Sequence, residues 1–209
     1  MYNYRWFSVL YSLLIICFQL LISGCTNPMI GLGAAATTAI QQERGFTGTA
    51  NDLGIKTNIT ALFLKKHKNL FPDITTDVFE GRVMITGSVS SEMERNMIEN
   101  TVKKSVGVRL ILNELQVTKL KRNILQDKII NFTLINKLVR DSSIFAINFS
   151  SSTVNGIVYL IGIAQNRSEI DRVIGHARNI KFVRQIVNHI ILKTDPIRRK
   201  ILLPVSQNE

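Results

Sequence analysis

The stretch that decides the fold is Glu80-Gly81-Arg82-Val83-Met84-Ile85-Thr86-Gly87, which returns 75 residues later as Asn155-Gly156-Ile157-Val158-Tyr159-Leu160-Ile161-Gly162. Both copies place a two-residue turn before an apolar run, and Asn-Gly is the strongest short signal for a hairpin. The same shift, without a gap, aligns Asp52 with Asp127, Glu94 with Glu169 and Asn113 with Asn188. The chain therefore contains one domain twice, at 52–118 and 127–193, with a short linker at 119–126.

Each copy is predicted to run helix, strand, strand, helix, strand. The first helix is expected to open at an N-capping aspartate, Asp52 or Asp127. It is expected to bury apolar residues at helical spacing, namely Ile55, Ile59 and Phe63 in the first copy and Ile130, Leu134 and Leu138 in the second. Two paired strands follow, at 74–79 and 82–86 and again at 147–154 and 157–161, with a glycine ending the second. A capping-box pattern starts the second helix, at Ser91-x-x-Glu94 and at Asn166-x-x-Glu169. This order indicates the α+β class, with a three-stranded mixed sheet covered by two helices. So small a core is marginal alone, and we expect the two copies to pack together.

The last strand of the first copy carries the motif Gly107-Val108-Arg109-Leu110-Ile111-Leu112-Asn113-Glu114-Leu115. Together with the aspartate, the hairpin glycines and the repeat, this motif resembles the BON domain. Two such domains behind an N-terminal lipid anchor are similar to the dual-BON-domain outer-membrane lipoproteins. The second copy has Phe182 where the first has Gly107, and we interpret this change as a backbone requirement relaxed in the second copy.

The N-terminus reads as a lipoprotein signal peptide, residues 1–24. An apolar run from Phe7 to Ile22 is too short and too close to the start for a membrane span, and it leads into Ile22-Ser23-Gly24-Cys25. That ending resembles the lipobox of bacterial lipoproteins, in which the chain is cut before the cysteine and the cysteine is acylated, with palmitate as a typical chain. Thr26 favours the outer membrane by resemblance to enterobacterial sorting rules, so we expect a protein anchored there and facing the periplasm. The alternative is an uncleaved signal anchor with an ordinary cysteine.

Cysteine count and net charge limit the kinds of site and partner that the mature chain can have. Cleavage would remove Cys17 and acylation would consume Cys25, which leaves no thiol for a disulfide or a metal site. After cleavage the chain has 25 bases against 15 acids, so its formal charge is +10. Such a charge favours anionic partners, and an envelope protein meets anionic phospholipid rather than nucleic acid. Residues 25–51 are expected to form a tether and residues 194–209 a basic flexible tail.

The first helices of the two copies differ on the face away from the core. In the first copy this face carries small or polar residues such as Gly54, Thr57 and Thr60, whereas the second copy has large apolar ones. The second face comprises four apolar residues flanked by three bases: Ile129, Phe132, Ile135 and Val139, with Lys128, Lys137 and Arg140. Such a face suits an anionic membrane surface. The alternatives are packing against the other copy, packing against the mate in a dimer, and a protein partner.

Signals for chemistry are nearly absent from the sequence. The histidines His67, His176 and His189 lack metal-ligand spacing, and no nucleophile elbow, phosphate loop or zinc signature occurs. We therefore expect no enzyme, no cofactor and no metal. The BON resemblance implies phospholipid binding and support of envelope integrity. The alternative function is an adaptor in an outer-membrane assembly or secretion complex, and the sequence predicts no oligomeric state.

Overall fold

The computed structural model describes residues 45–66, 74–118 and 123–198. The expected signal peptide and Cys25 lie outside these residues. Domain 1 contains α3 (Gly45–Lys66), β1 (Ile74–Phe79), β2 (Arg82–Val89), α4 (Glu92–Lys103) and β3 (Leu110–Val117). Domain 2 contains α5 (Ile124–Arg140), the short 3-10 helix η2 (Ala146–Asn148), β4 (Phe149–Val154), β5 (Ile157–Ala164), α6 (Arg167–Arg178) and β6 (Gln185–Leu192).

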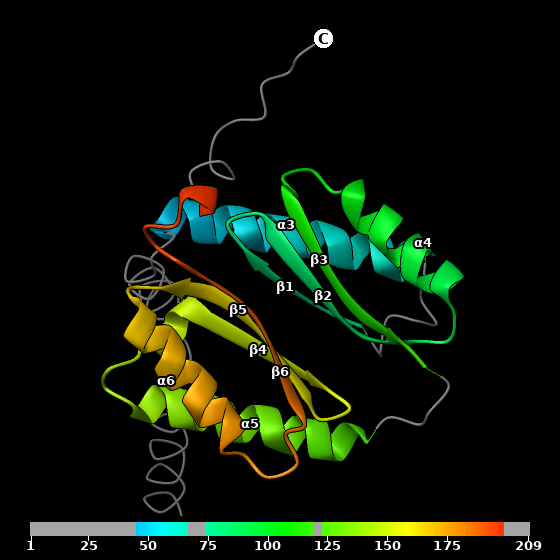
Figure 1. Ribbon diagram of the computed structural model, residues 1–209. Coiled ribbons are helices and arrows are strands. Elements are labelled where there is room, and N and C mark those ends of the chain that lie inside the picture. Colours follow the sequence, from blue (N-terminus) through cyan, green and yellow to red (C-terminus); the bar gives the residue numbers. More distant parts are fainter. Residues whose placement is uncertain (1–44, 67–73, 119–122, 199–209) are drawn as a thin grey trace, which may run out of the picture. The chain divides into compact units, whose positions relative to one another are not determined.

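Both domains have the same sheet topology. The middle strand, β2 or β5, pairs antiparallel with the preceding strand and parallel with the last one. Because a parallel pair needs a crossover connection, α4 and α6 lie between their two strands in sequence and cover the sheet together with α3 and α5 (Figure 1). The expected α+β class, with three-stranded mixed sheets each covered by two helices, is confirmed.

The expected helix starts are wrong. α3 begins at Gly45 and α5 at Ile124, with Asn123 as the N-cap whose side chain accepts from the amide of Gln126. Asp52 and Asp127 therefore lie within their helices. The physical reason is that each aspartate points inward. Its carboxylate accepts from the backbone amides of the hairpin turn, so it does not cap the end of the helix.

The capping boxes are confirmed in their first half. The side chains of Ser91 and Asn166 accept from the amides of Glu94 and Glu169, respectively, at 3.2 Å and 3.0 Å. The expectation that a glycine ends the second strand is wrong, because β2 and β5 both continue beyond it. Gly162 instead allows a close approach, since a Cβ there would lie 2.3 Å from the carbonyl oxygen of Asn148.

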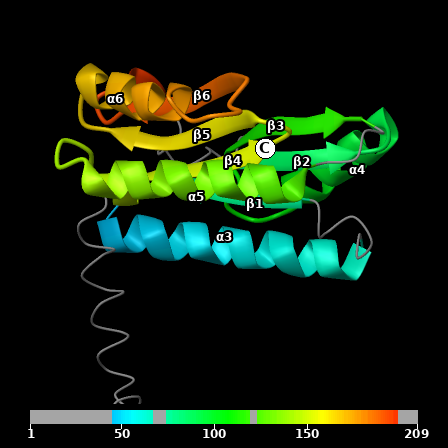
Figure 2. The same cartoon turned by 90° about the horizontal axis from the view of Figure 1, so that it is seen from below.

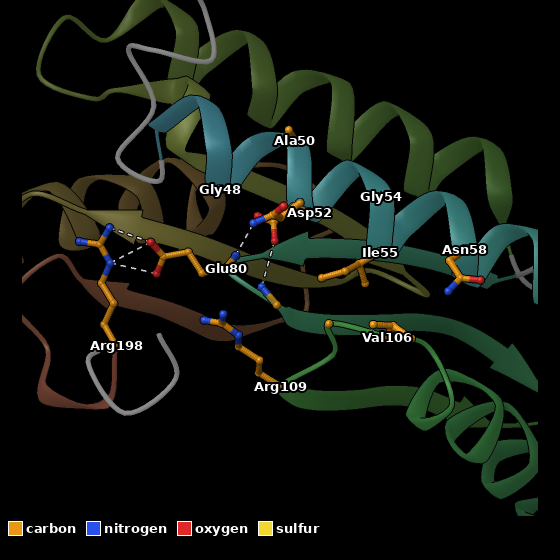
Figure 3. A pocket seen from close by; sticks show the side chains of 13 residues that line it. Gly48, Ala50, Asp52, Gly54, Ile55, Asn58, Glu80, Val106, Arg109 and Arg198 are labelled. Atoms are coloured by element: carbon orange, nitrogen blue, oxygen red, sulfur yellow. Dashed lines mark hydrogen bonds and ion pairs between the residues drawn. The ribbon is translucent and has the colours of Figure 1, made fainter. Parts of the chain in front are cut away.

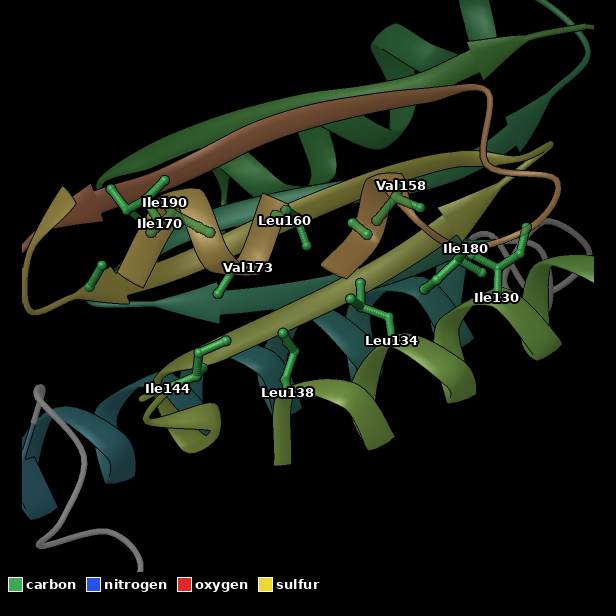
Figure 4. Close-up of a cluster of buried hydrophobic side chains, with 12 residues drawn as sticks. Ile130, Leu134, Leu138, Ile144, Val158, Leu160, Ile170, Val173, Ile180 and Ile190 are labelled. Carbon is green, nitrogen blue, oxygen red and sulfur yellow. The ribbon is translucent and has the colours of Figure 1, made fainter. Parts of the chain in front are cut away.

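Each domain has a core between its helices and one face of its sheet. In domain 2, Figure 4 shows Ile130, Leu134 and Leu138 of α5 turned toward the sheet, where they meet residues of β5 and α6. In domain 1, Ile55, Ile59 and Phe63 of α3 take the corresponding places. The helical spacing of apolar residues in the sequence predicted all of these positions.

The other faces of the two sheets pack on each other. A third cluster joins Phe79 and Met84 of domain 1 to Val154, Tyr159 and Ile161 of domain 2, all at most 5% exposed. Contacts between β2 and β4 and between β1 and β5 belong to the same interface (Figures 1 and 2). The expectation that the two copies pack together is confirmed, and the packing is sheet on sheet with the helices outside.

Polar groups cross this interface as well. Arg82 is 2% exposed and donates from its two terminal nitrogens to the carbonyl oxygens of His189 and Gly162, both at 2.9 Å. Burial lowers the pKa of its guanidinium to about 10, so the group stays charged at neutral pH. Glu114 and His189 are equivalent positions of the repeat, and their side chains meet at 2.8 Å. The interface is therefore nearly two-fold, with one position contacting its own counterpart.

Candidate functional site

The four apolar residues of the second α5 face are exposed, and we call them the α5 stripe. The exposed fractions are 57% for Ile129, 70% for Phe132, 47% for Ile135 and 68% for Val139. The alternative that domain 1 covers this stripe is wrong, because the domains meet through their sheets and leave the outer side of α5 open. An apolar face of this size on a helix that already fills its own core is typical of a contact surface.

Basic side chains border the stripe as the sequence predicted. Lys128 and Arg140 are exposed and Lys137 is half-buried. Within the described part of the chain, none of the three forms an ion pair. The positive charge around the stripe is therefore not neutralised locally.

The acids of domain 2 are all engaged elsewhere. Asp127 and Glu169 are each 2% exposed and accept from backbone amides. Asp141 accepts from Arg172 and contacts His176 at 2.8 Å, and the hydrogen bond with His176 is the main reason why the pKa of Asp141 falls to about 2. Asp171 lies 3.8 Å from Arg167.

The charge of the protein is unevenly divided between the domains. Residues 127–193 contain nine bases and four acids, a formal charge of +5. Residues 52–118 contain nine bases and eight acids, a formal charge of +1. The domain with the apolar stripe is thus also the domain with the basic surface, which suits an anionic partner.

A buried aspartate fixes the first helix of each domain to its hairpin. Asp127 accepts from the amides of Asn155 and Gly156, both at 2.9 Å. Asp52 accepts in the same way from Glu80 and Gly81, at 2.8 Å and 2.9 Å. Both turns carry their first residue in the left-handed region, which aims two consecutive amides at one carboxylate. This clamp ties α5, and with it the α5 stripe, to the hairpin of the sheet. In the sequence, only the repeated aspartate pointed to it.

Domain 1 has a pocket of about 690 Å³ beside the first half of α3 (Figure 3). Small residues open it, namely Gly48, Gly54 and Gly107. Its acids already have partners, since Asp52 holds the turn amides and Glu80 receives Arg198 from the end of the described chain at 2.7–3.0 Å. The carboxylates that line the pocket are therefore already hydrogen-bonded or ion-paired within the protein.

Large side chains take the corresponding places in domain 2. The repeat puts Leu125, Ile129 and Phe182 at the positions of Ala50, Gly54 and Gly107, and all three are more than half exposed. Phe182 has φ +71, close to the +89 of Gly107. The interpretation of a relaxed backbone requirement is therefore wrong, because the second copy keeps the left-handed backbone and places a bulky residue on it. Sequence reasoning missed Phe182 as a surface residue, although the repeat comparison had already singled out the position.

An apolar groove of about 220 Å³ adjoins the C-terminal half of the stripe. Ile135 and Val139 form one wall, and Ala146, Ile147 and Phe149 form the other. The stripe is therefore bordered by a recess on this side, which gives an apolar ligand more contact area than a flat helix face.

No group of His, Cys, Asp and Glu within the described ranges could hold a metal ion. No helix within the same ranges is both long and apolar enough to span a membrane.

Comparison with known proteins places the chain in a family. A protein of Anaplasma centrale, described as an uncharacterized protein in the gshII 5' region, is 34% identical over 147 residues, which is 66% of this chain and 97% of that protein. Two structures of CdsD, a structural protein of the type III secretion system of Chlamydia trachomatis, align with 18% and 15% identity. They cover 68% and 65% of this chain, and this chain covers 66% and 90% of theirs, with TM-scores of 0.28 and 0.29. Those scores are too low for either likeness to bear on fold or function here.

The family model of the BON domain matches residues 51–119 and again residues 126–194. BON domains are associated with phospholipid binding and with envelope proteins, and they are generally non-catalytic. The two matches cover most of the described helices and strands, and together they span more than half of the chain. The protein therefore belongs to the BON-domain family and carries two BON domains in tandem.

Proposed function

We propose that this protein is a non-catalytic envelope lipoprotein that binds anionic phospholipid membrane through the α5 stripe and supports outer-membrane integrity. The observation that carries the proposal is the exposed apolar stripe on a domain whose acids are all engaged. Apolar side chains that enter the acyl boundary, with bases at the level of the phosphates, are the usual design of an interfacial helix.

The shape of α5 supports an interfacial rather than a spanning contact. Ile130, Leu134 and Leu138 are at most 4% exposed because they fill the domain core, so only the outer face is free for lipid. A helix held in this way lies flat on a bilayer with Phe132 toward the acyl chains. The basic surface adds attraction to anionic headgroups, which salt weakens.

The lipid anchor belongs to the same proposal. Residues 1–24 would be removed as a signal peptide and Cys25 would be acylated, which would fix the chain to the periplasmic side of the outer membrane. Two acyl chains on one residue meet the two-signal requirement for stable anchoring. The α5 stripe would then set the orientation of the domains on the membrane rather than provide the attachment itself.

Vesicle binding by a form that starts at Thr26 tests the stripe without the anchor. This form keeps all three core clusters of the described residues. We expect it to bind vesicles that contain phosphatidylglycerol and not to bind vesicles of pure phosphatidylcholine. Its affinity should fall as the salt concentration rises. Phe132→Asp should abolish binding, whereas Met93→Asp, at a position on α4 of domain 1 that is 79% exposed, should leave binding unchanged. Intact binding by a folded Phe132→Asp variant would rule out the stripe as the contact.

The second candidate function is an adaptor for an outer-membrane assembly or secretion complex. The same exposed stripe favours it, because an apolar helix face also suits a protein groove. A photoreactive side chain at Phe132 in cells separates the two. Adducts with phospholipid support membrane binding, whereas one dominant adduct with an envelope protein supports the adaptor.

A further inference from the structure

Phe182 is an exposed aromatic residue on a backbone that favours glycine. Its φ is +71, and a bulky residue in the left-handed region is a strained outlier. At the equivalent position, domain 1 has Gly107, which adopts this conformation without strain. The same turn can therefore be built with glycine, as domain 1 shows. Domain 2 has a phenylalanine there, and its ring is 56% exposed.

The loop around Phe182 is firmly held. Ile180 is 8% exposed and belongs to the core cluster of domain 2, where Figure 4 shows it beside Ile130. The amide of Val183 donates to the carbonyl of Ile180 at 3.2 Å, and the amide of Arg184 donates to the carbonyl of Gly156 at 2.8 Å. The ring is therefore presented by a fixed loop, so a contact made by it needs little further ordering.

This loop lies beside the first turns of α5. A Cβ on Gly156 would lie 2.8 Å from the carbonyl oxygen of Phe182, and Gly156 is also held by Asp127. In domain 1 the equivalents of Ile129 and Phe182, Gly54 and Gly107, line one pocket. The shared fold thus puts Phe182 on the same side of domain 2 as Ile129, toward the N-terminal end of the α5 stripe.

Two cations flank the ring. The Nζ of Lys181 lies 4.8 Å from the ring centroid of Phe182. Arg184 is exposed, and its Nε donates to the carbonyl of Asn155 at 2.9 Å, which fixes the guanidinium near the loop. Asp127, which holds the neighbouring Gly156, is buried and bound to amides, whereas Lys181 and Arg184 are exposed.

We propose that Phe182 is a second insertion point into an anionic bilayer, with Lys181 and Arg184 at the level of the lipid phosphates. This inference rests on the proposed function and extends its contact from one helix face to the 180–184 loop. Together with the α5 stripe, the ring makes an apolar patch supported by two separate elements. Contact through two elements fixes the rotation of domain 2 about the axis of α5, which the stripe alone leaves free.

Phe182→Gly tests the proposal, because it restores the residue that domain 1 has at this turn. In the form that starts at Thr26, we expect about tenfold weaker binding to vesicles of phosphatidylglycerol and phosphatidylcholine, from the apolar area withheld from the bilayer. The thermal stability should not fall, because glycine relieves the left-handed strain. Val106→Ser, on the loop of domain 1 at a position 84% exposed, is the matched control and should bind like the wild type.

A fluorescent reporter checks insertion directly. The one tryptophan of the chain is Trp6, which the form starting at Thr26 lacks. Phe182→Trp should therefore give a single emission that shifts to the blue on vesicle binding and is quenched by brominated acyl chains. Met93→Trp in domain 1 should show neither effect.

The outcomes separate this inference from the proposed function. If the wild type fails to bind the vesicles, both fall. If Phe132→Asp abolishes binding while Phe182→Gly binds like the wild type, the second insertion point is wrong and the α5 stripe remains the membrane contact. The same conclusion follows if the emission of Phe182→Trp does not shift on bound vesicles. Weaker binding by a fully stable Phe182→Gly, together with the Phe182→Trp shift, supports the inference.

Discussion

Replacing Met84 with alanine tests whether the two BON domains unfold as one unit. Met84 is fully buried, and it lies in the cluster between the sheets rather than in the core of either domain. The same cluster contains Tyr159 and Ile161 of domain 2. The substitution therefore weakens the contact between the domains and leaves both helix-covered cores intact.

The expected loss follows from complete burial. Truncating a buried methionine to alanine removes its transfer free energy and leaves a cavity, which together cost about 2–5 kcal/mol. The sheets cannot shift freely into the cavity, because the hydrogen bonds of Arg82 to Gly162 and His189 fix their separation at one side. We therefore expect about 3 kcal/mol. For a chain of this size that corresponds to a fall in melting temperature of roughly 6–12 °C.

Calorimetry and hydrogen exchange on the form that starts at Thr26 measure both consequences. The melting temperature should fall, and amide protection should fall in β4 and β5 of domain 2 although the substitution lies in domain 1. Met93→Ala is the control, since a residue 79% exposed should change stability by no more than about 0.5 kcal/mol. A loss below about 1 kcal/mol, with exchange altered in domain 1 alone, would refute the sheet-on-sheet interface.

Three further predictions concern buried or paired carboxylates. Asp127→Asn removes a charged acceptor from two amides of the 155–156 turn and should lower the free energy of unfolding by about 2–3 kcal/mol in urea, whereas an unchanged midpoint would mean that the clamp does not hold α5. Asp141 has its pKa lowered to about 2, chiefly by its hydrogen bond with His176, so its contribution is present above the unfolded pKa and is lost as the pH falls toward 2. The melting temperature of the wild type should therefore fall more steeply between about pH 4 and pH 2 than that of Asp141→Asn, and parallel curves would contradict this. Burial raises the pKa of Asp77, so the folded state disfavours its charged form, and Asp77→Asn should raise the melting temperature at pH 7 by an amount that shrinks as acid protonates the wild type.

The replacement of Gly107 by Phe182 in the second copy shows what can and cannot be predicted from the sequence. The repeat comparison identified Phe182 in place of Gly107, and the nature of that change depends on the backbone angle. A residue's φ is set by the hydrogen bonds of its neighbours, here the amide of Arg184 on the 155–156 turn, and these have no local signature in the sequence. The position of Phe182 could therefore be singled out from the sequence, but the exposure of its ring and its role could not.

The sheet interface was signalled only weakly. The run Val158-Tyr159-Leu160-Ile161 is apolar without alternation, which indicates a strand buried on both faces. The run alone does not say what covers the second face. Only the structure shows that the equivalent run of domain 1 covers it and that Arg82 spans the two sheets.

The sequence by itself determined the repeat, the order of helices and strands, the residues that the first helix of each copy buries and the two apolar faces of α5. Each of these follows from spacing along one chain segment, which the periods of helix and strand translate into faces. The tertiary structure alone decided that the α5 stripe stays uncovered, that Asp52 and Asp127 clamp hairpins instead of capping helices, and that Phe182 is held outward. These three features depend on contacts between groups far apart in the chain. The packing of the whole domain decides those contacts, and the periodicity of one segment does not predict them.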